Sequence, residues 1–383
     1  MKQILFPSKL PQVKNSIFTI MSKLAIEQNA INLSQGFPEF QSDKKLINLV
    51  SKAMNAGYNQ YAPMAGVLSL RKKVCEKINS LYGSSYHPET DITITAGATQ
   101  AIFTIISAFI EKNDEVILFN PAYDCYEPAI ILNGGIPKPI SLKTPDYHID
   151  WNEVQQKTTS KTKMIIINSP HNPSGTVLSE ADMIALQKLV RDTNILILSD
   201  EVYEHIIFDG KQHQSVARFP ELAMRSFITA SFGKTFHNTG WKVGYCVAPK
   251  QLMAEFQKVH QFNVFCVNHP MQHALAIYLD NEKNYLGLAA FYQLKRDLFL
   301  EGIKNSRWEF IPASGSYFQL LSYKKITDEG DVEFAKRLTI EKKVASIPTS
   351  VFYSSRQNPK MLRFCFAKTE ETLKKATEIL SKL

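Results

Sequence analysis

The sequence predicts an α/β protein in which helices cover both faces of a mainly parallel sheet and a smaller α+β domain is attached. Short, nearly continuous apolar runs alternate with amphipathic stretches, as expected when strands are buried on both faces. After about residue 280 the pattern changes to a long polar-rich helical stretch and then further strands. We therefore expect a large domain at residues 46–280 and a small domain formed by residues 1–45 and 281–383.

The strands of the large domain are predicted where apolar residues run with few interruptions. Helices are expected at 98–111 and 181–191, where apolar residues recur at spacings of three and four. Ser179 precedes the second of these helices as its N-cap. The predicted strands are 92–95, 115–119, 164–167, 195–199, 227–230 and 243–247.

The small domain is predicted to begin with a helix at residues 291–305, and strands follow at 309–311, 316–321 and 362–366. The first 45 residues contain three prolines and no strong sheet pattern. We expect this N-terminal segment to fold against the small domain.

Composition and length are those of an ordinary globular protein. The chain has 383 residues, of which 44% are hydrophobic and 21% are charged, which excludes disordered, collagen-like and coiled-coil classes. No secretory leader pattern is present and no apolar run reaches the roughly 18 residues of a membrane span, so we expect a cytoplasmic protein without membrane contact. The net charge is +8, but Lys and Arg are dispersed, and we expect no nucleic acid partner. Five scattered cysteines without a CxxC pair argue against disulfides and a structural zinc site, so no metal is expected.

The most informative segment is Ser-Phe-Gly-Lys-Thr at residues 231–235, which directly follows a predicted strand. A lysine at the end of a sheet strand can lose part of its hydration, and its amine can then act as a nucleophile that forms a Schiff base. An isolated lysine is usually a surface charge. Lys234 becomes a candidate because three other features lie at the ends of neighbouring strands.

Each of these features adds a different chemical group. Asp200 ends one strand and Tyr203 lies in the turn that follows it. Asn172 stands between two prolines in a turn after another strand, and residues 95–100 join a strand to the N-terminus of a helix, which is a natural anion site. All four features fall on one edge of the sheet. An amine, a carboxylate, two neutral hydrogen-bonding groups and an anion cradle are what pyridoxal 5′-phosphate (PLP) requires.

The chain resembles fold-type I PLP enzymes, and specifically the class I/II aminotransferases. The resemblance extends from about residue 31 to residue 366, and it is greatest to bacterial methionine aminotransferases and to kynurenine/glutamine transaminases. The shared sequence motifs are Gln-Gly-Phe-Pro at 35–38, Asn-Gln-Tyr-Ala-Pro at 59–63 and Pro-His-Asn-Pro-Ser at 170–174.

The resemblance implies three catalytic residues. Lys234 would form the Schiff base with PLP and later carry the proton between the substrate Cα and the cofactor. Asp200 would pair with the pyridine nitrogen and keep it protonated. Tyr203, together with Asn172, would hydrogen-bond the phenolic oxygen of the cofactor.

The resemblance also assigns binding residues. Arg363 would grip the substrate α-carboxylate, and Tyr123 would stack on the pyridine ring. Tyr61 would reach the phosphate of the neighbouring subunit, which implies a homodimer. The remaining residues are the phosphate ligands Ala98, Thr99, Ser231 and Lys242, the last of which is arginine in many relatives, and the substrate contacts Asn172, Gly36 and Phe18.

The expected reaction moves the amino group of a neutral, thioether or aromatic L-amino acid to a 2-oxo acid, with methionine-like donors favoured. A PLP-dependent C–S β-lyase is the alternative within the same fold, and a non-catalytic PLP-sensing domain is a remote one. His171 and His205 stand beside the motifs without a second ligand at useful spacing, so neither is expected to bind metal. The glycines after residue 232 form no dinucleotide-binding fingerprint.

Overall fold

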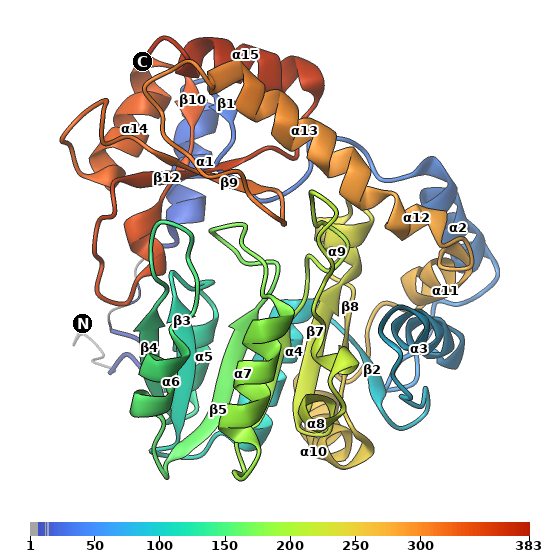
Figure 1. The fold of residues 1–383 in the computed structure, drawn as a ribbon. Helices are drawn as coiled ribbons and strands as arrows, with labels where there is room; N and C mark the ends of the chain where they lie inside the picture. The colour runs from blue at the N-terminus through green and yellow to red at the C-terminus, as the bar shows by residue number, and fades with distance from the viewer. Residues whose placement is uncertain (1–6, 12, 14) are drawn as a thin grey trace, which may run out of the picture.

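The computed structural model describes residues 7–11, 13 and 15–383, and its centre is a seven-stranded sheet (Figure 1). The strand order is β2-β8-β7-β6-β5-β3-β4, and only β8 runs against its neighbours. The predicted mainly parallel sheet is therefore confirmed. Its strands are β2 (Ile92–Thr95), β3 (Glu115–Asn120), β4 (Ile136–Ser141), β5 (Thr162–Asn168), β6 (Leu196–Asp200), β7 (Ser226–Ser231) and β8 (Gly244–Val247).

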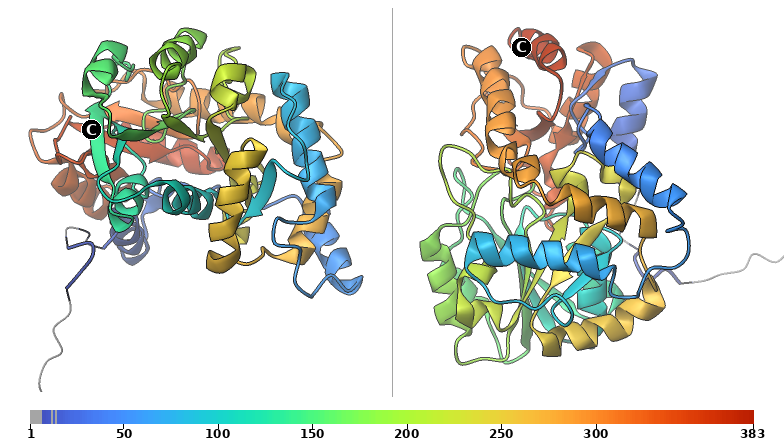
Figure 2. Two further views of the ribbon diagram at one scale, coloured as in Figure 1. Left: turned by 90° about the horizontal axis from the view of Figure 1, so that it is seen from below. Right: turned by 90° about the vertical axis from the view of Figure 1, so that its right-hand side faces the viewer.

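Helices cover both faces of this sheet (Figure 2). One face packs against α4 (Ala98–Phe109), α5 (Tyr126–Leu132) and α10 (Lys250–Asn263). The other face packs against α6 (Trp151–Lys157) and α7 (Glu180–Val190). Beside β2, at one end of the sheet, lie α2 (Lys44–Asn55), α3 (Leu68–Tyr82) and α11 (His269–Tyr278).

The N-terminal and C-terminal parts of the chain form a second layer above the carboxyl ends of most strands (Figure 1). Three antiparallel strands have the order β11-β12-β9, and β1 pairs in parallel with β10. These strands and the helices around them share one apolar cluster. The strands are β1 (Ile31–Asn32), β9 (Phe318–Ser322), β10 (Val344–Ala345), β11 (Ile347–Pro348) and β12 (Met361–Cys365), and the helices are α1 (Ile17–Glu27), α13 (Leu288–Ile303), α14 (Asp331–Glu341) and α15 (Glu370–Leu380).

The pairing of β1 with β10 joins the N-terminal segment to the C-terminal part of the chain, where the amide of Ile31 donates to the carbonyl of Lys343 at 2.8 Å. The smaller α+β part is therefore present. Its exact boundaries at residues 45 and 280 stay a prediction. Single-turn helices complete the chain: α8 (Pro220–Ala223), α9 (Phe232–Thr235) and α12 (Lys283–Leu286).

Most predicted elements are confirmed within a few residues of their ends. The N-cap of α7 is also confirmed, because the Ser179 hydroxyl accepts the amide of Asp182 and the Asp182 carboxylate accepts the amide of Ser179. Every helix in the described ranges is too short or too polar to cross a bilayer.

One predicted strand was wrong, and one strand of the main sheet was not predicted. Residues 309–311 form only a single bridge, from Glu309 to Ser322, because Pro312 ends the extended run and both Glu309 and Ile311 are exposed. The strand β4 was missed because it contains Pro137 and Pro139. Two residues apart, these prolines lack N–H groups on the same side of the strand, which suits the free edge of the sheet that β4 occupies.

The direction of β8 decides where the functional groups meet. Because β2, β5, β6 and β7 run the same way, the residues that follow them reach one edge of the sheet. The antiparallel β8 begins at that edge, where Gly244 pairs with both Thr95 and Ser231. Lys242, two residues before β8, therefore lies beside the residues that follow the other strands.

Candidate active site

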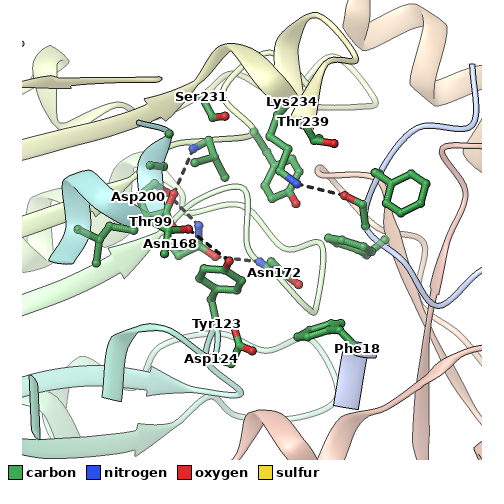
Figure 3. Close-up of a pocket in the computed structure, with 18 of the residues that line it drawn as sticks. Phe18, Thr99, Tyr123, Asp124, Asn168, Asn172, Asp200, Ser231, Lys234 and Thr239 are labelled. Atoms are coloured by element: carbon green, nitrogen blue, oxygen red, sulfur yellow. Dashed lines mark hydrogen bonds between the residues drawn. The ribbon is translucent and has the colours of Figure 1, made fainter. Parts of the chain in front are cut away.

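A cavity of about 370 Å³ lies at this edge of the sheet, and Figure 3 shows the side chains around it. Its walls combine residues from the ends of the main strands with residues from the N-terminal segment, β9 and β12. The structure thus brings together every predicted cofactor and substrate residue except Tyr61. These are Phe18, Gly36, Ala98, Thr99, Tyr123, Asn172, Asp200, Tyr203, Ser231, Lys234, Lys242 and Arg363.

Lys234 stands in α9, a single helical turn that directly follows β7. Its amine donates hydrogen bonds to the Tyr317 hydroxyl at 2.9 Å and to the Gly36 carbonyl at 3.1 Å. The cavity leaves part of the side chain accessible, but the surrounding protein displaces water and lowers the pKa of the amine to about 8. Part of the amine population is therefore uncharged near neutral pH, and an uncharged amine can serve as nucleophile or base.

Asp200 is the last residue of β6 and is 3% exposed. Its carboxylate accepts a hydrogen bond from the Tyr126 hydroxyl at 2.6 Å and one from the amide of Val202 at 3.2 Å. Burial raises the pKa of Asp200 to about 6, although both hydrogen bonds act against the rise. A buried carboxylate with an oxygen facing a cavity is suited to accept a hydrogen bond from a cationic ligand.

Asn168, at the end of β5, connects the turn that carries Asn172 to the strand that carries Asp200. Its amide nitrogen donates to the Asp200 carbonyl at 2.9 Å, and its oxygen accepts the backbone amide of Asn172 at 2.9 Å. The turn that carries Asn172 is thus fixed to the strand that carries Asp200. Asn168 also lines the cavity.

The N-terminus of α4 forms an anion cradle on the opposite wall from the small sheet. Gly97, with a φ of +78°, turns the chain into the helix, and a Cβ at this residue would lie 3.3 Å from the Lys242 amine. Thr99 and Ser231 line the same part of the cavity. Free helix amides, two hydroxyls and an ammonium group together suit a phosphate.

Arg363, on β12, is 1% exposed and lines the cavity. One guanidinium nitrogen donates to the Asn172 side-chain oxygen at 2.7 Å and another to the Ser34 carbonyl at 3.2 Å, while Nε has no partner in the described part of the chain. The ring of Phe318 lies 3.9 Å from the guanidinium carbon. Burial lowers the pKa of Arg363 to about 10. A buried guanidinium without a carboxylate partner is suited to bind an anionic ligand.

Aromatic rings form much of the remaining wall. The Tyr203 ring is buried, 5.1 Å from the ring of Tyr317 between centroids, and its centroid is 5.7 Å from the Lys234 amine. The Tyr123 hydroxyl lies 3.5 Å from that of Thr99. These contacts bring Tyr203 and Tyr123 to the cavity from two different loops.

Tyr61 lies outside this cavity. It is 79% exposed, and its ring packs edge-on against that of Phe265 with centroids 5.1 Å apart. Phe265 and the nearby Phe262 are themselves 50% and 87% exposed. Three exposed aromatic side chains in one region are unusual for a surface that faces only water.

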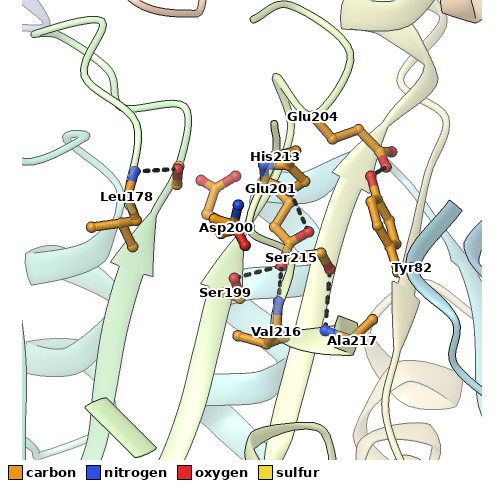
Figure 4. Close-up of polar contacts among 12 residues, drawn as sticks. Tyr82, Leu178, Ser199, Asp200, Glu201, Glu204, His213, Ser215, Val216 and Ala217 are labelled. Carbon is orange, nitrogen blue, oxygen red and sulfur yellow. Dashed lines mark hydrogen bonds and ion pairs between the residues drawn. The ribbon is translucent and has the colours of Figure 1, made fainter. Parts of the chain in front are cut away.

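A second polar network lies beside Asp200 but does not line the cavity (Figure 4). The Glu201 carboxylate lies 2.7 Å from His213 Nε2 and accepts the Ser199 hydroxyl at 2.8 Å. The Glu204 carboxylate accepts the Tyr82 hydroxyl at 2.7 Å. These contacts hold the segment that follows β6 in place.

The two histidines beside the motifs are not among the residues that line the cavity. His171 Nδ1 lies 2.6 Å from the Ser174 hydroxyl, and burial lowers the pKa of His171 to about 4. His205 Nε2 lies 3.2 Å from the Lys77 amine, and burial lowers its pKa to about 3. Across residues 7–11, 13 and 15–383, no three potential metal ligands of the His, Cys, Asp and Glu types come together.

Sequence reasoning missed four residues of the site: Tyr126, Asn168, Tyr317 and Asp124. Tyr126 bonds Asp200, Asn168 bonds two site segments, Tyr317 bonds Lys234, and Asp124 lines the cavity. Asn168 and Asp124 each adjoin a motif, so their position at a strand end was an available signal. Nothing in the sequence pattern indicates the pairings of Tyr126 or Tyr317.

Known proteins resemble this chain over its whole length. The family model described as aminotransferase class I and II matches residues 28–380. Methionine aminotransferase of Escherichia coli K12 is 47% identical over 377 residues, which is 98% of each chain. Kynurenine–oxoglutarate transaminase of Dictyostelium discoideum is 34% identical over 408 residues, or 96% of this chain and 94% of the relative.

Solved structures agree with these matches. A crystal structure of an Escherichia coli protein with an identified methionine aminotransferase function superposes with a TM-score of 0.97 at 47% identity, covering 100% of both chains. N-succinyldiaminopimelate aminotransferase from Mycobacterium tuberculosis superposes with a TM-score of 0.94 at 31% identity, covering 99% of this chain and 100% of the other. The expected family is confirmed, and this chain belongs to the class I and II aminotransferases.

Proposed function

We propose that the protein is a PLP-dependent aminotransferase whose preferred amino donor is methionine or another neutral thioether or aromatic L-amino acid. The observation that carries this proposal is the convergence of Lys234, Asp200 and Arg363 on one cavity. They supply an amine of lowered pKa, a buried carboxylate and a buried guanidinium whose Nε has no partner among the described residues. The acceptor would be a 2-oxo acid, which occupies the same site in the second half of the reaction.

The residues of the cavity fit PLP. The anion cradle at Gly97 would hold the phosphate through the amide of Ala98, the hydroxyls of Thr99 and Ser231, and the Lys242 amine. A side chain at Gly97 would crowd the Lys242 amine, so the glycine leaves room for a phosphate beside the cation. Bound PLP would serve as an electron sink for the substrate Cα.

The hydrogen-bonding and stacking groups of the cavity would hold the pyridine ring of PLP. The Asp200 carboxylate would accept the N–H of the pyridine ring, and its hydrogen bond from Tyr126 keeps an oxygen oriented for this role. Asn172 and Tyr203 would bond the phenolic oxygen, and the Tyr123 ring would stack on the pyridine.

Lys234 would hold PLP covalently until the substrate amine displaces it. Its freed amine would then take the proton from the substrate Cα, because it is the group with a suitable pKa on this wall of the cavity. The hydrogen bonds from Lys234 to Tyr317 and Gly36 restrict where the amine can move.

Arg363 would bind the substrate α-carboxylate, since its planar guanidinium matches a carboxylate and its Nε has no partner in the described part of the chain. Asn172 would share this contact, because it already bonds the guanidinium. Phe18, whose ring lies 5.2 Å from the guanidinium carbon, and Gly36 would border the substrate side chain. An apolar wall suits methionine, and the 47% identical Escherichia coli relative is a methionine aminotransferase.

We also propose a homodimer in which Tyr61 reaches the phosphate in the neighbouring subunit. The support is its 79% exposure, beside Phe262 and Phe265, on a surface rich in uncovered aromatic rings. A cytoplasmic location stays a prediction of the sequence.

The test is spectroscopic. The purified protein should bind PLP with visible absorbance, methionine should bleach it, and a 2-oxo acid should restore it. Lys234→Ala should lower turnover by at least about 10³-fold while the protein still folds. Release of pyruvate and ammonia from cystathionine without any 2-oxo acid would instead favour the C–S β-lyase. Tight PLP binding without reaction with any amino acid would favour the PLP-sensing domain.

A further inference from the structure

Asp124 is the one charged group on the described cavity wall that has no role in the proposed reaction. It directly follows Tyr123, and Figure 3 places it between Tyr123 and Phe18. Its side chain is exposed to the cavity, and its carboxylate makes no hydrogen bond or ion pair with another described side chain. Desolvation by the surrounding protein raises the pKa of Asp124, and the charge of Arg363 opposes the rise.

The other charges of the wall are already committed under the proposed function. Lys234 holds PLP, Lys242 holds its phosphate, and Arg363 holds the α-carboxylate of the substrate. Asp200 pairs with the pyridine nitrogen. No fourth cation lines the cavity in the described part of the chain, so a second carboxylate on the substrate would find no partner there.

We infer that Asp124 determines substrate specificity by repelling amino and 2-oxo acids that carry a second carboxylate. The inference rests on the proposed function, and it extends to the acceptor because both half-reactions use one cavity. A carboxylate on the substrate side chain would meet Asp124 at short range in a partly dehydrated site, where like charges repel strongly. Neutral side chains, and those that end in an N–H donor, avoid this repulsion.

The inference separates substrates of equal size. Glutamine ends in an amide where glutamate ends in a carboxylate of nearly the same size, so shape cannot distinguish them. With Asp124 charged, the enzyme should prefer glutamine to glutamate, and a neutral 2-oxo acid to 2-oxoglutarate. Specificity of this kind comes from a repulsive element in addition to attractive ones.

The experiment compares two unreactive five-carbon ligands, pentanoate and glutarate, which carry one and two carboxylates. Their dissociation constants with the holoenzyme are measured from the absorbance change of bound PLP. Asp124→Asn should lower the ratio of the glutarate to the pentanoate constant by about tenfold, with pentanoate binding changed less than twofold. The kcat/KM ratio of glutamine to glutamate should fall by a similar factor.

Two further variants serve as controls. Asp124→Glu keeps the charge and should retain the discrimination against glutarate. Asp192→Asn removes an exposed carboxylate in the turn before β6, at the opposite end of that strand from Asp200, and should change neither ratio.

Two results would overturn the inference. If Asp124→Asn leaves the glutarate-to-pentanoate ratio unchanged, Asp124 does not repel the second carboxylate. If it weakens both ligands equally, Asp124 acts by positioning Arg363 and not by selecting substrates. Failure of the proposed function is distinct, because the wild-type holoenzyme would then not be bleached by methionine.

Discussion

The Tyr126 hydroxyl donates a 2.6 Å hydrogen bond to the Asp200 carboxylate inside the protein. Tyr126 begins α5 and Asp200 ends β6, so two residues 74 positions apart in the chain meet at one oxygen atom. Burial first, and then the charge of Asp200, hold the pKa of the phenol far above its usual range, so Tyr126 remains a donor at every physiological pH. The bond fixes the carboxylate that is proposed to face the cofactor nitrogen.

Replacing this phenol should weaken both folding and cofactor binding. Tyr126→Phe removes a hydrogen bond to a charged group, which contributes about 2 kcal/mol to the free energy of unfolding. We expect about a tenfold rise in the PLP dissociation constant and a lower kcat with unchanged KM for methionine. Tyr86→Phe is the matched control, because its buried hydroxyl has no partner among the described residues. Equal effects of the two variants would contradict the role of Tyr126.

The lowered pKa of Lys234 predicts how the stability of the PLP-free protein depends on pH. The amine has a pKa of about 8 when folded and 10.5 when exposed, so folding disfavours its charged form. The penalty is complete below pH 8 and disappears as pH rises from 8 to 10.5, because the folded state has by then lost its proton.

Lys234→Met should therefore stabilise the PLP-free protein, by at most about 3 kcal/mol below pH 8. The difference between the variant and wild type should shrink steadily between pH 8 and 10.5. Urea unfolding followed at several pH values measures this difference directly. A difference that is constant across this range would mean that the amine is not desolvated.

Arg363 should contribute to substrate binding through the α-carboxylate alone. Arg363→Lys replaces a planar guanidinium, which can bind a carboxylate through two hydrogen bonds, by a compact ammonium. We therefore expect kcat/KM for methionine to fall by about 10²-fold, mainly because KM rises. The absorbance of bound PLP should not change. The amine 3-(methylthio)propylamine lacks the carboxylate, and it should react equally slowly with the variant and wild type. A loss that is as large for this amine as for methionine would show that Arg363 acts elsewhere.

The shared-site dimer can be tested by mixing subunits. Tyr61→Ala and Lys234→Ala should each lower activity when they are present in both subunits. A mixed dimer of the two variants has one site with both changes and one site with neither, if Tyr61 serves the neighbouring subunit. Refolding an equal mixture should then restore up to about a quarter of wild-type activity, since about half of random dimers are mixed. No gain on mixing would place Tyr61 and Lys234 of one chain at the same site.

Six of the seven strands of the main sheet, and the functional residues at their ends, could be predicted from the sequence. Asp200, Asn172 and Lys234 could be predicted because a parallel sheet brings the residues after its strands to one edge, which is a rule of chain direction and needs no side-chain detail. The family resemblance added Arg363, which lies on a strand of the other layer and is brought to the cavity only by folding. The proline-containing edge strand β4 was missed because an edge strand needs neither a continuous apolar run nor all of its N–H groups.

Which side chains meet inside the site depends on the packing of the whole chain. Tyr126 reaches Asp200, and Tyr317 reaches Lys234, across 74 and 83 residues of chain, and no local spacing encodes those distances. Tertiary structure also left Asp124 facing the cavity without a hydrogen-bond or ion-pair partner among the described side chains. Local pattern follows from backbone geometry and burial, whereas the pairing of distant side chains depends on how whole layers pack against each other.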